Sequence, residues 1–167
     1  MYRTTTILLQ VFFVVLYSFP WRGDAASPLL YHKNMAPLLA LDLGLRRTGV
    51  AFGDDEKFMI IALDTIAHKT TDELIAALGP IITARKVSRL IVGLPRLLDG
   101  SEGKQANIVR EMAQTIEAKL SLPIEFIDER YTTNSVKKMT GDPDAQSACV
   151  LLEIALDRIA QRDVDKS

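Results

Sequence analysis

The most constraining feature of this sequence is a set of short apolar runs that stop at an acidic residue or a glycine. Residues 38–41 end at Asp42, residues 89–93 end in a glycine, and residues 123–127 end at Asp128. Apolar runs of this length between turn signals are typical of buried strands. A strand that is apolar on both of its faces needs cover on both sides. The chain is therefore expected to form a sheet on which helices pack.

The remaining elements follow from periodicity. Residues 48–52 and 58–63 predict two more strands, which would form an antiparallel meander with the first strand. Helical spacing of apolar residues predicts helices over 71–84, 105–120 and 144–160. The fold class is therefore α/β, with a mixed sheet of a three-strand antiparallel meander plus parallel strands and flanking helices. Sites in such sheets form at the carboxyl ends of the parallel strands.

The first 34 residues differ in composition from the rest of the chain. Residues 7–19 are almost wholly apolar and follow Arg3, which resembles a signal-peptide core and is too short for a membrane span. The domain pattern begins directly after Met35, which favours Met35 as the true start and 1–34 as a leader outside the fold. We expect one domain over 36–160, with no membrane association, and a tail over 161–167.

Composition limits the chemistry that the chain can use. Cys149 is the single cysteine, and His32 and His68 are the only histidines, which argues against a zinc site of the Cys/His type. A metal would have to be bound by carboxylates, which suits Mg²⁺ or Mn²⁺. The formal net charge of −1 argues neither for nor against a nucleic-acid partner.

Asp42 is the first candidate metal ligand. A carboxylate at a strand end is held by the sheet and is well placed to bind a metal, and the glycines that follow, Gly44 and Gly49, would let substrate or backbone approach closely. A turn aspartate between hairpin strands explains Asp42 equally well. A similar Asp-x-Gly pattern also opens actin-like ATPase and sugar-kinase folds, where it serves phosphate binding.

The loop after the central strand is polar and rich in glycine. Asp99 or Ser101 could cap the helix that begins near Gln105, which would explain these polar residues without a function. The loop nevertheless lies where a sheet places ligands, and a helix N-terminus there would offer backbone N–H groups to a phosphate. The residues that this second interpretation singles out are Gly93, Pro95, Asp99, Gly100 and Glu102.

Acids also follow the strand at 123–127, where Asp128 and Glu129 lie at its end. A solvated strand exit, with Thr133 capping a short helix, is the alternative explanation. Asp144 is the last candidate. Its position two residues after Asp142 and next to Pro143 is typical of a capped helix start.

The helical register indicates which side of the predicted helix carries Asp144. It shares a face with Ala148 and Leu151, which places it on the stripe that packs against the core. An acid that points inward costs free energy unless it is paired or bound to a metal. Asp142 lies before the proline, where a cap belongs.

Together these acids can converge on one face of the sheet. Convergent carboxylates repel one another unless cations are bound. A pair of Mg²⁺ ions about 3.5–4 Å apart would satisfy them and activate water for in-line attack on a phosphodiester. Basic residues flank the acidic motifs, and arginine suits bidentate contact with phosphate. The expected nucleic-acid-binding residues are Arg46, Arg47, Arg96, Arg130, Lys137 and Lys138.

Five segments in order resemble the YqgF/RuvX family: Asp-Leu-Gly-x-Arg-Arg-x-Gly-Val-Ala at 42–51, Val-Gly-Leu-Pro at 92–95, Asp-Gly-Ser-Glu-Gly at 99–103, Asp-Glu-Arg-Tyr-Thr-Thr at 128–133 and Asp-x-x-x-Ala at 144–148. The resemblance covers 36–160. That family has a ribonuclease H-like fold, is described as cytoplasmic, and is linked to processing the 5′ end of pre-16S rRNA. By similarity it is linked to Holliday junction resolvases. The resemblance implies that Asp42, Glu129 and Asp144 are the catalytic, metal-binding acids, with Asp128 as the nearest substitute.

The resulting hypothesis is a metal-dependent endonuclease that acts on structured RNA such as pre-rRNA, within ribosomal precursor particles, or on branched DNA. Family members usually have a longer, basic segment where this chain has only 134–143, and Leu97 replaces a common asparagine. A weakly or non-catalytic nucleic-acid or ribosome-assembly binding protein therefore stays open. An actin-like phosphotransferase is disfavoured because the chain has no room for a second lobe.

We predict that residues 1–34 are dispensable, because the apolar run at 7–19 has no place in the expected domain. A chain that begins at Met35 should have the same melting temperature and activity as the full chain. Loss of cooperative unfolding after this truncation, followed by circular dichroism, would show that the leader packs on the core.

Overall fold

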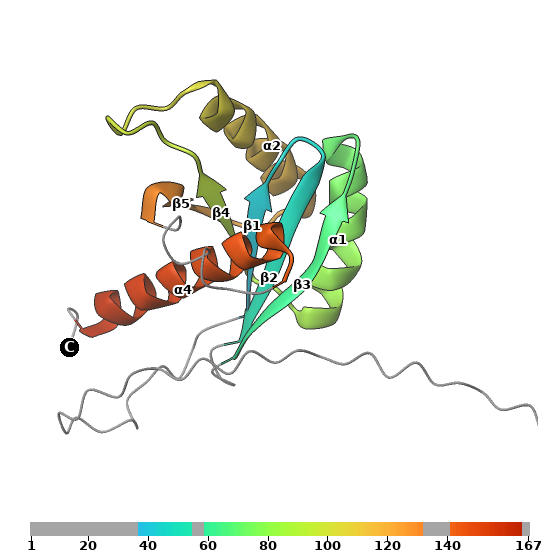
Figure 1. The fold of residues 1–167 in the computed structure, drawn as a ribbon. Coiled ribbons are helices and arrows are strands. Elements are labelled where there is room, and N and C mark those ends of the chain that lie inside the picture. The colour runs from blue at the N-terminus through green and yellow to red at the C-terminus, as the bar shows by residue number, and fades with distance from the viewer. Residues whose placement is uncertain (1–36, 55–58, 132–140, 165–167) are drawn as a thin grey trace, which may run out of the picture.

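The computed structural model describes residues 37–54, 59–131 and 141–164, and its strands form one five-stranded mixed sheet (Figure 1). Strands β1 (Leu38–Leu43), β2 (Arg47–Asp54) and β3 (Met59–Ala67) form an antiparallel meander. Strands β4 (Arg89–Leu94) and β5 (Ile124–Asp128) extend the sheet in parallel with β1. The strand order β3-β2-β1-β4-β5 confirms the predicted mixed sheet.

Within these described ranges, three α-helices flank the sheet: α1 (Thr71–Arg85), α2 (Lys104–Leu120) and α4 (Pro143–Val164). A short 3₁₀ helix, η2 (Glu129–Tyr131), directly follows β5. The helices lie close to the predicted ranges. Among the described helices, none has the length and apolar character that crossing a membrane would require.

Side-chain alternation divides the core into two layers. Leu39 and Leu41 of β1 pack in one cluster with residues of α1 and α2, whereas Leu38 and Ala40 pack in the other with residues of α4. Figure 1 shows α4 on one face of the sheet and α1 and α2 on the other. Both faces of β1 and β4 are covered, which explains why these strands are almost continuously apolar. The α4 face also receives Asp42, since it follows Leu38 and Ala40 at the strand's period of two.

Helix α4 approaches β2 unusually closely at its first turn. A Cβ atom added to Gly49 would lie 1.9 Å from the main-chain oxygen of Asp144. Gly49 is also the cross-strand neighbour of Asp42 in the pairing of β1 with β2. A glycine inside a strand commonly marks such a close backbone approach. The absence of a side chain at Gly49 therefore lets the start of α4 lie directly over the end of β1.

We predict that Gly49→Ala destabilises the fold by about 2–3 kcal/mol, because the new methyl group meets backbone that cannot rotate away. The measurement is urea unfolding followed by circular dichroism. Gly79→Ala in α1 is the matched control, because a Cβ at Gly79 has no neighbour within 4 Å. Alanine there should raise stability by about 0.5–1 kcal/mol. Equal stability of the Gly49→Ala variant and the unmodified chain would contradict the close packing.

Candidate active site

The ends of the parallel strands place two acids on the α4 face of the sheet. Asp42 lies near the end of β1, and Glu129 follows β5 directly. Ile127 packs in the core cluster that contains α4, and Glu129 lies two residues later. Between these strands, a Cβ at Gly93 would come within 2.5 Å of Oε1 of Glu129. Gly93 therefore leaves the space that the Glu129 carboxyl occupies.

Helix α4 brings the third acid to this face. The Oδ1 atom of Asp142 accepts a hydrogen bond of 3.0 Å from the backbone N–H of Asp144, as a helix cap does. The helix then begins at Pro143, as predicted. Ala148 and Leu151 are buried on the face expected for Asp144, while the Asp144 side chain is 38% exposed at the rim. The predicted start of α4 and its buried stripe are therefore confirmed, whereas Asp144 lies at the rim and does not point into the core as expected.

The three acids influence one another electrostatically. Burial, together with the charges of Asp42 and Asp128, raises the pKa of Glu129 to about 7. Burial also raises the pKa of Asp42; the hydroxyl of Ser147 opposes this shift, and Asp144 adds to it. Asp42 is thus the central member of the group, because it interacts with both Glu129 and Asp144.

Arg47 neutralises the outer member of this group. Its Nε donates a hydrogen bond of 2.7 Å to Oδ2 of Asp144, and its Nη2 lies 3.0 Å from Oδ2 of Asp142. The Arg47 side chain is 57% exposed, so solvent screens both ion pairs. Arg47 can therefore leave Asp144 at little cost when another cation or a phosphate arrives.

The donor set suits a hard divalent cation, because Asp42, Glu129 and Asp144 offer only carboxylate oxygens. Within the described ranges, no three His, Cys, Asp or Glu residues are close enough to form a ready-made metal site. The Asp144 carboxylate is paired with Arg47 instead. The sheet fixes two of the acids, and the rim position of Asp144 leaves its side chain room to turn.

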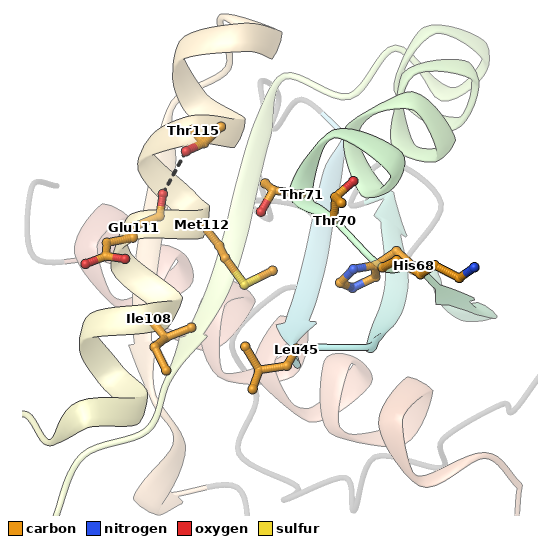
Figure 2. A pocket seen from close by; sticks show the side chains of 9 residues that line it. Leu45, His68, Thr70, Thr71, Ile108, Glu111, Met112 and Thr115 are labelled. Carbon is orange, nitrogen blue, oxygen red and sulfur yellow. Dashed lines mark hydrogen bonds between the residues drawn. The ribbon is translucent and has the colours of Figure 1, made fainter.

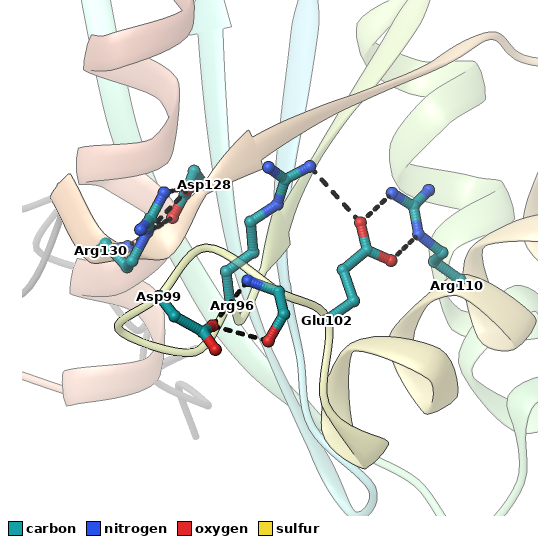
Figure 3. Close-up of polar contacts among 7 residues, drawn as sticks. Arg96, Asp99, Glu102, Arg110, Asp128 and Arg130 are labelled. Atoms are coloured by element: carbon teal, nitrogen blue, oxygen red, sulfur yellow. Dashed lines mark hydrogen bonds and ion pairs between the residues drawn. The ribbon is translucent and has the colours of Figure 1, made fainter.

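Asp128 has a different environment from its neighbour Glu129. Alternation along β5 points Asp128 toward the other face of the sheet. There the Arg130 guanidinium donates hydrogen bonds to both of its carboxylate oxygens, 3.1 Å to Oδ1 and 2.7 Å to Oδ2 (Figure 3). Hydrogen bonding to Arg130 lowers the pKa of Asp128, although burial opposes the shift. The geometry therefore distinguishes the two adjacent acids, and Glu129 is the one that approaches Asp42.

The loop between β4 and α2 is closed by its own hydrogen bonds. Asp99 accepts bonds of 2.9 and 2.6 Å from the N–H and the hydroxyl of Ser101, and Gly100 has a φ of +87°, which favours glycine. The interpretation of Asp99 or Ser101 as a cap was wrong. The N-cap of α2 is Gly103, which makes no side-chain cap bond. The carboxylate of Asp99 is used inside the loop instead.

Ion pairs connect this loop to α2. Glu102 accepts two hydrogen bonds of 2.6 Å from Arg110 and lies 3.4 Å from Arg96, as Figure 3 shows. These contacts, led by the bonds from Arg110, lower the pKa of Glu102. Pro95 joins β4 to Arg96, whose backbone forms an isolated antiparallel β-bridge with Glu102. The loop is therefore held in one shape at the carboxyl end of β4.

The predicted basic residues fall into three groups. Arg46 and Arg47 line an open pocket of about 320 Å³ together with Asp42, Gly44, Leu45 and Asp144. Arg96 and Arg130 lie at the loop after β4 and pair with Glu102 and Asp128. Lys137, Lys138 and the suggested cap Thr133 lie outside the described residues.

Two residues that shape the site were missed by sequence reasoning. Ser147 lies beside Asp42, and Arg110 holds Glu102. The close backbone approach expected at the glycines of residues 42–50 is found at Gly49, where α4 lies against β2. The contacts of Ser147 and Arg110 depend on tertiary packing and left no local signal.

The fold and site define a mixed α/β domain whose acids gather at the carboxyl ends of parallel strands, beside two arginines. The family model described as "RuvX: Holliday junction resolvase" matches residues 36–158, and the chain belongs to this family. Its ribonuclease H-like fold agrees with the observed strand order.

Individual relatives agree with the family assignment. A protein of Chloroflexus aurantiacus is 36% identical over 117 residues, which cover 70% of this chain and 76% of the relative. A protein of Anaeromyxobacter dehalogenans is 35% identical over 133 residues, which cover 73% of this chain and 97% of the relative. Both are named "Putative pre-16S rRNA nuclease". The solved structure of T. thermophilus RuvC in complex with Holliday junction substrate is 10% identical, covers 70% of this chain and 92% of that chain, and has a TM-score of 0.48.

We predict that Glu129→Gln stabilises the metal-free protein above neutral pH. The folded-state pKa of about 7 exceeds the ordinary value of 4.5, so the stability linked to protonation is present below pH 4.5 and is lost as pH rises through 7. Glutamine removes that loss. The gain at pH 8 should be about 1 kcal/mol, a figure reduced to allow for solvent screening.

The measurement is thermal unfolding in EDTA at pH 5 and pH 8. The matched control is Glu111→Gln, which alters an exposed acid on α2 and should leave the pH dependence unchanged. A variant Glu129→Gln that is less stable than the unmodified chain at pH 8 would show that the Glu129 charge is favourable in the fold.

Proposed function

We propose that this chain is a metal-dependent endonuclease that hydrolyses phosphodiesters in structured RNA, acting at the 5′ end of pre-16S rRNA during ribosome biogenesis. The observation that carries the proposal is the electrostatic coupling of Asp42 with Glu129 and Asp144, at the strand ends of a chain that belongs to the RuvX family. The names of its relatives support rRNA as the substrate. This function would place the domain in the cytoplasm, with 1–34 outside the fold. The expected boundary at 160 with a tail over 161–167 is corrected by the structure, because α4 continues to Val164.

Asp42, Glu129 and Asp144 are the residues that would hold Mg²⁺ or Mn²⁺. A divalent ion bound there supplies the positive charge that activates water and stabilises phosphoryl oxygens. Asp42 contributes a carboxylate fixed by the sheet, and Gly93 leaves room for Glu129. Asp144 adds a carboxylate whose position is set by the capped start of α4.

Arg46 and Arg47 would orient the substrate backbone. Both line the pocket that contains Asp42 and Asp144, and both are exposed. The guanidinium of Arg47 is held at the pocket by Asp144 and can exchange that carboxylate for a phosphate. Arg96, Arg130, Lys137 and Lys138 are further candidates for backbone contacts outside this pocket, and their contribution should weaken with salt.

A Holliday junction is the second candidate substrate. The family description favours it, since it names a Holliday junction resolvase. The same acids would serve hydrolysis of DNA and RNA. A comparison of cleavage rates on a 16S rRNA precursor and on a four-way DNA junction separates the two substrates.

We predict that Asp42→Asn and Asp144→Asn each lower the cleavage rate by more than ~100-fold, because each removes a charge that the metal requires. The measurement is Mg²⁺-dependent cleavage of the rRNA precursor, with melting temperatures recorded for every variant. Retained cleavage in either variant would remove that residue from the site.

Asp142→Asn is the matched control for Asp144→Asn. Like Asp144→Asn, this substitution removes one negative charge from the start of α4, and Asp142 also contacts Arg47. Asparagine remains a good helix cap. Its cleavage rate and melting temperature should stay close to those of the unmodified chain. If Asp142→Asn abolishes cleavage while Asp144→Asn does not, Asp142 replaces Asp144 as the ligand. A folded chain that binds RNA without cleaving any substrate would instead favour a binding protein.

A further inference from the structure

A second pocket lies on the opposite face of the sheet from α4. Its volume is about 320 Å³, and it is formed by the turn after β1, the start of α1 and one side of α2. Figure 2 shows Met112 of α2 and His68 extending toward one another across this space, with Leu45 below them and Thr70 and Thr71 above. The volume lies at the lower end of the range for small-ligand sites.

His68 is a buried polar group in the wall of this pocket. The residue is 5% exposed, and its Nε2 lies 2.9 Å from the hydroxyl of the fully buried Thr48. Its Nδ1 is buried and has no hydrogen-bond partner among the described residues. The main chain of Thr70 is close enough to the ring to raise the pKa of His68, although burial is the larger influence and lowers it. A buried nitrogen in this state favours a ligand that can pair with it.

The charged residues that line the pocket have opposite signs, because Lys69 and Glu111 both belong to its wall, and this balance favours a neutral ligand. Burial lowers the pKa of His68, so the imidazole is neutral at physiological pH; Glu73 opposes this shift and Arg46 adds to it. Glu111 lines the wall, and the carboxylate of Glu73 accepts a hydrogen bond of 2.7 Å from the N–H of Lys69 at the start of α1. These two acids disfavour a phosphate at this helix N-terminus.

The pocket borders the acidic site at one shared residue. Leu45 lines this pocket and also the pocket that holds Asp42, Arg47 and Asp144. Its side chain is 65% exposed at the turn between β1 and β2. A nucleic-acid chain whose backbone lies against the arginines can therefore pass over Leu45 and present its next nucleotide to the second pocket.

We propose that this second pocket binds an unpaired nucleobase of the substrate, next to the phosphodiester that is cleaved. A base is neutral and planar, and its edge carries donors and acceptors that can pair with His68 Nδ1 in either tautomer. Leu45, Ile108 and Met112 supply apolar surface for its faces. The inference rests on the proposed function and deepens it, because it selects substrates with an unpaired nucleotide beside the cleavage point.

The test is equilibrium binding of a fluorescent RNA hairpin with single-stranded tails, in EDTA, which prevents metal-dependent cleavage. Ile108→Trp fills the mouth of the pocket from α2, where Ile108 is 37% exposed. Gln114→Trp adds the same bulk to an exposed position on α2 outside the pocket. His68→Gln keeps an amide near the position of Nε2 to pair with Thr48 but removes Nδ1.

Ile108→Trp and His68→Gln should each weaken binding by about tenfold, while Gln114→Trp should leave it unchanged. Abasic substitution along the tails should reveal one position at which loss of the base weakens binding to the unmodified chain by a similar factor. Loss of the same base should not weaken binding to the Ile108→Trp variant any further. Binding by Ile108→Trp equal to that by Gln114→Trp, or the absence of a sensitive abasic position, overturns the base pocket. Cleavage activity retained in that case leaves the nuclease function standing. Binding without any cleavage overturns the nuclease function alone.

Discussion

The contact between the first turn of α4 and Gly49 of β2 is the constraint on which the site depends. The sheet by itself brings together only the residues at the ends of β1 and β5, and the third acid must come from a helix that follows in the sequence. The missing side chain at Gly49 allows the main chain of Asp144 to lie against β2, directly beside Asp42 in the β1–β2 pairing. Buried apolar residues along α4, such as Ala148 and Leu151, then hold the helix on the sheet. The contacts that pack α4 against the sheet therefore also bring the acids together.

Bringing carboxylates together in this way has an electrostatic cost. Burial and mutual repulsion raise the pKa of Glu129 to about 7, and burial raises the pKa of Asp42. The fold tolerates this because both side chains keep partial contact with solvent and Arg47 offsets the charge of Asp144. A cation relieves the repulsion more completely than an exposed arginine does. The cost in the metal-free state is thus the physical origin of the proposed metal affinity.

Much of this arrangement could be predicted from the sequence, because period-two and helical spacing determine which face each residue occupies. The strand meander, the parallel strands and the register that separates Asp142 from Asp144 follow from local patterns. Interactions between distant segments were beyond such reasoning. Asp99 bonds to Ser101 within its loop, so the expected cap of α2 was wrong. The pairing of Thr48 with His68 joins residues whose proximity depends on the irregular register between β2 and β3.

The most direct test of the central claim is to map where a metal binds along the chain. Fe²⁺ can take the place of Mg²⁺ on carboxylates, and in the presence of ascorbate and peroxide it generates hydroxyl radicals that cut the backbone beside the ion. The cut positions are read by mass spectrometry, with excess Mg²⁺ as competitor. The account predicts cuts at the end of β1 near Asp42, after β5 near Glu129 and at the start of α4 near Asp144, all suppressed by Mg²⁺. Cuts concentrated at the loop of Asp99 and Glu102, or no cuts that Mg²⁺ suppresses, would contradict it.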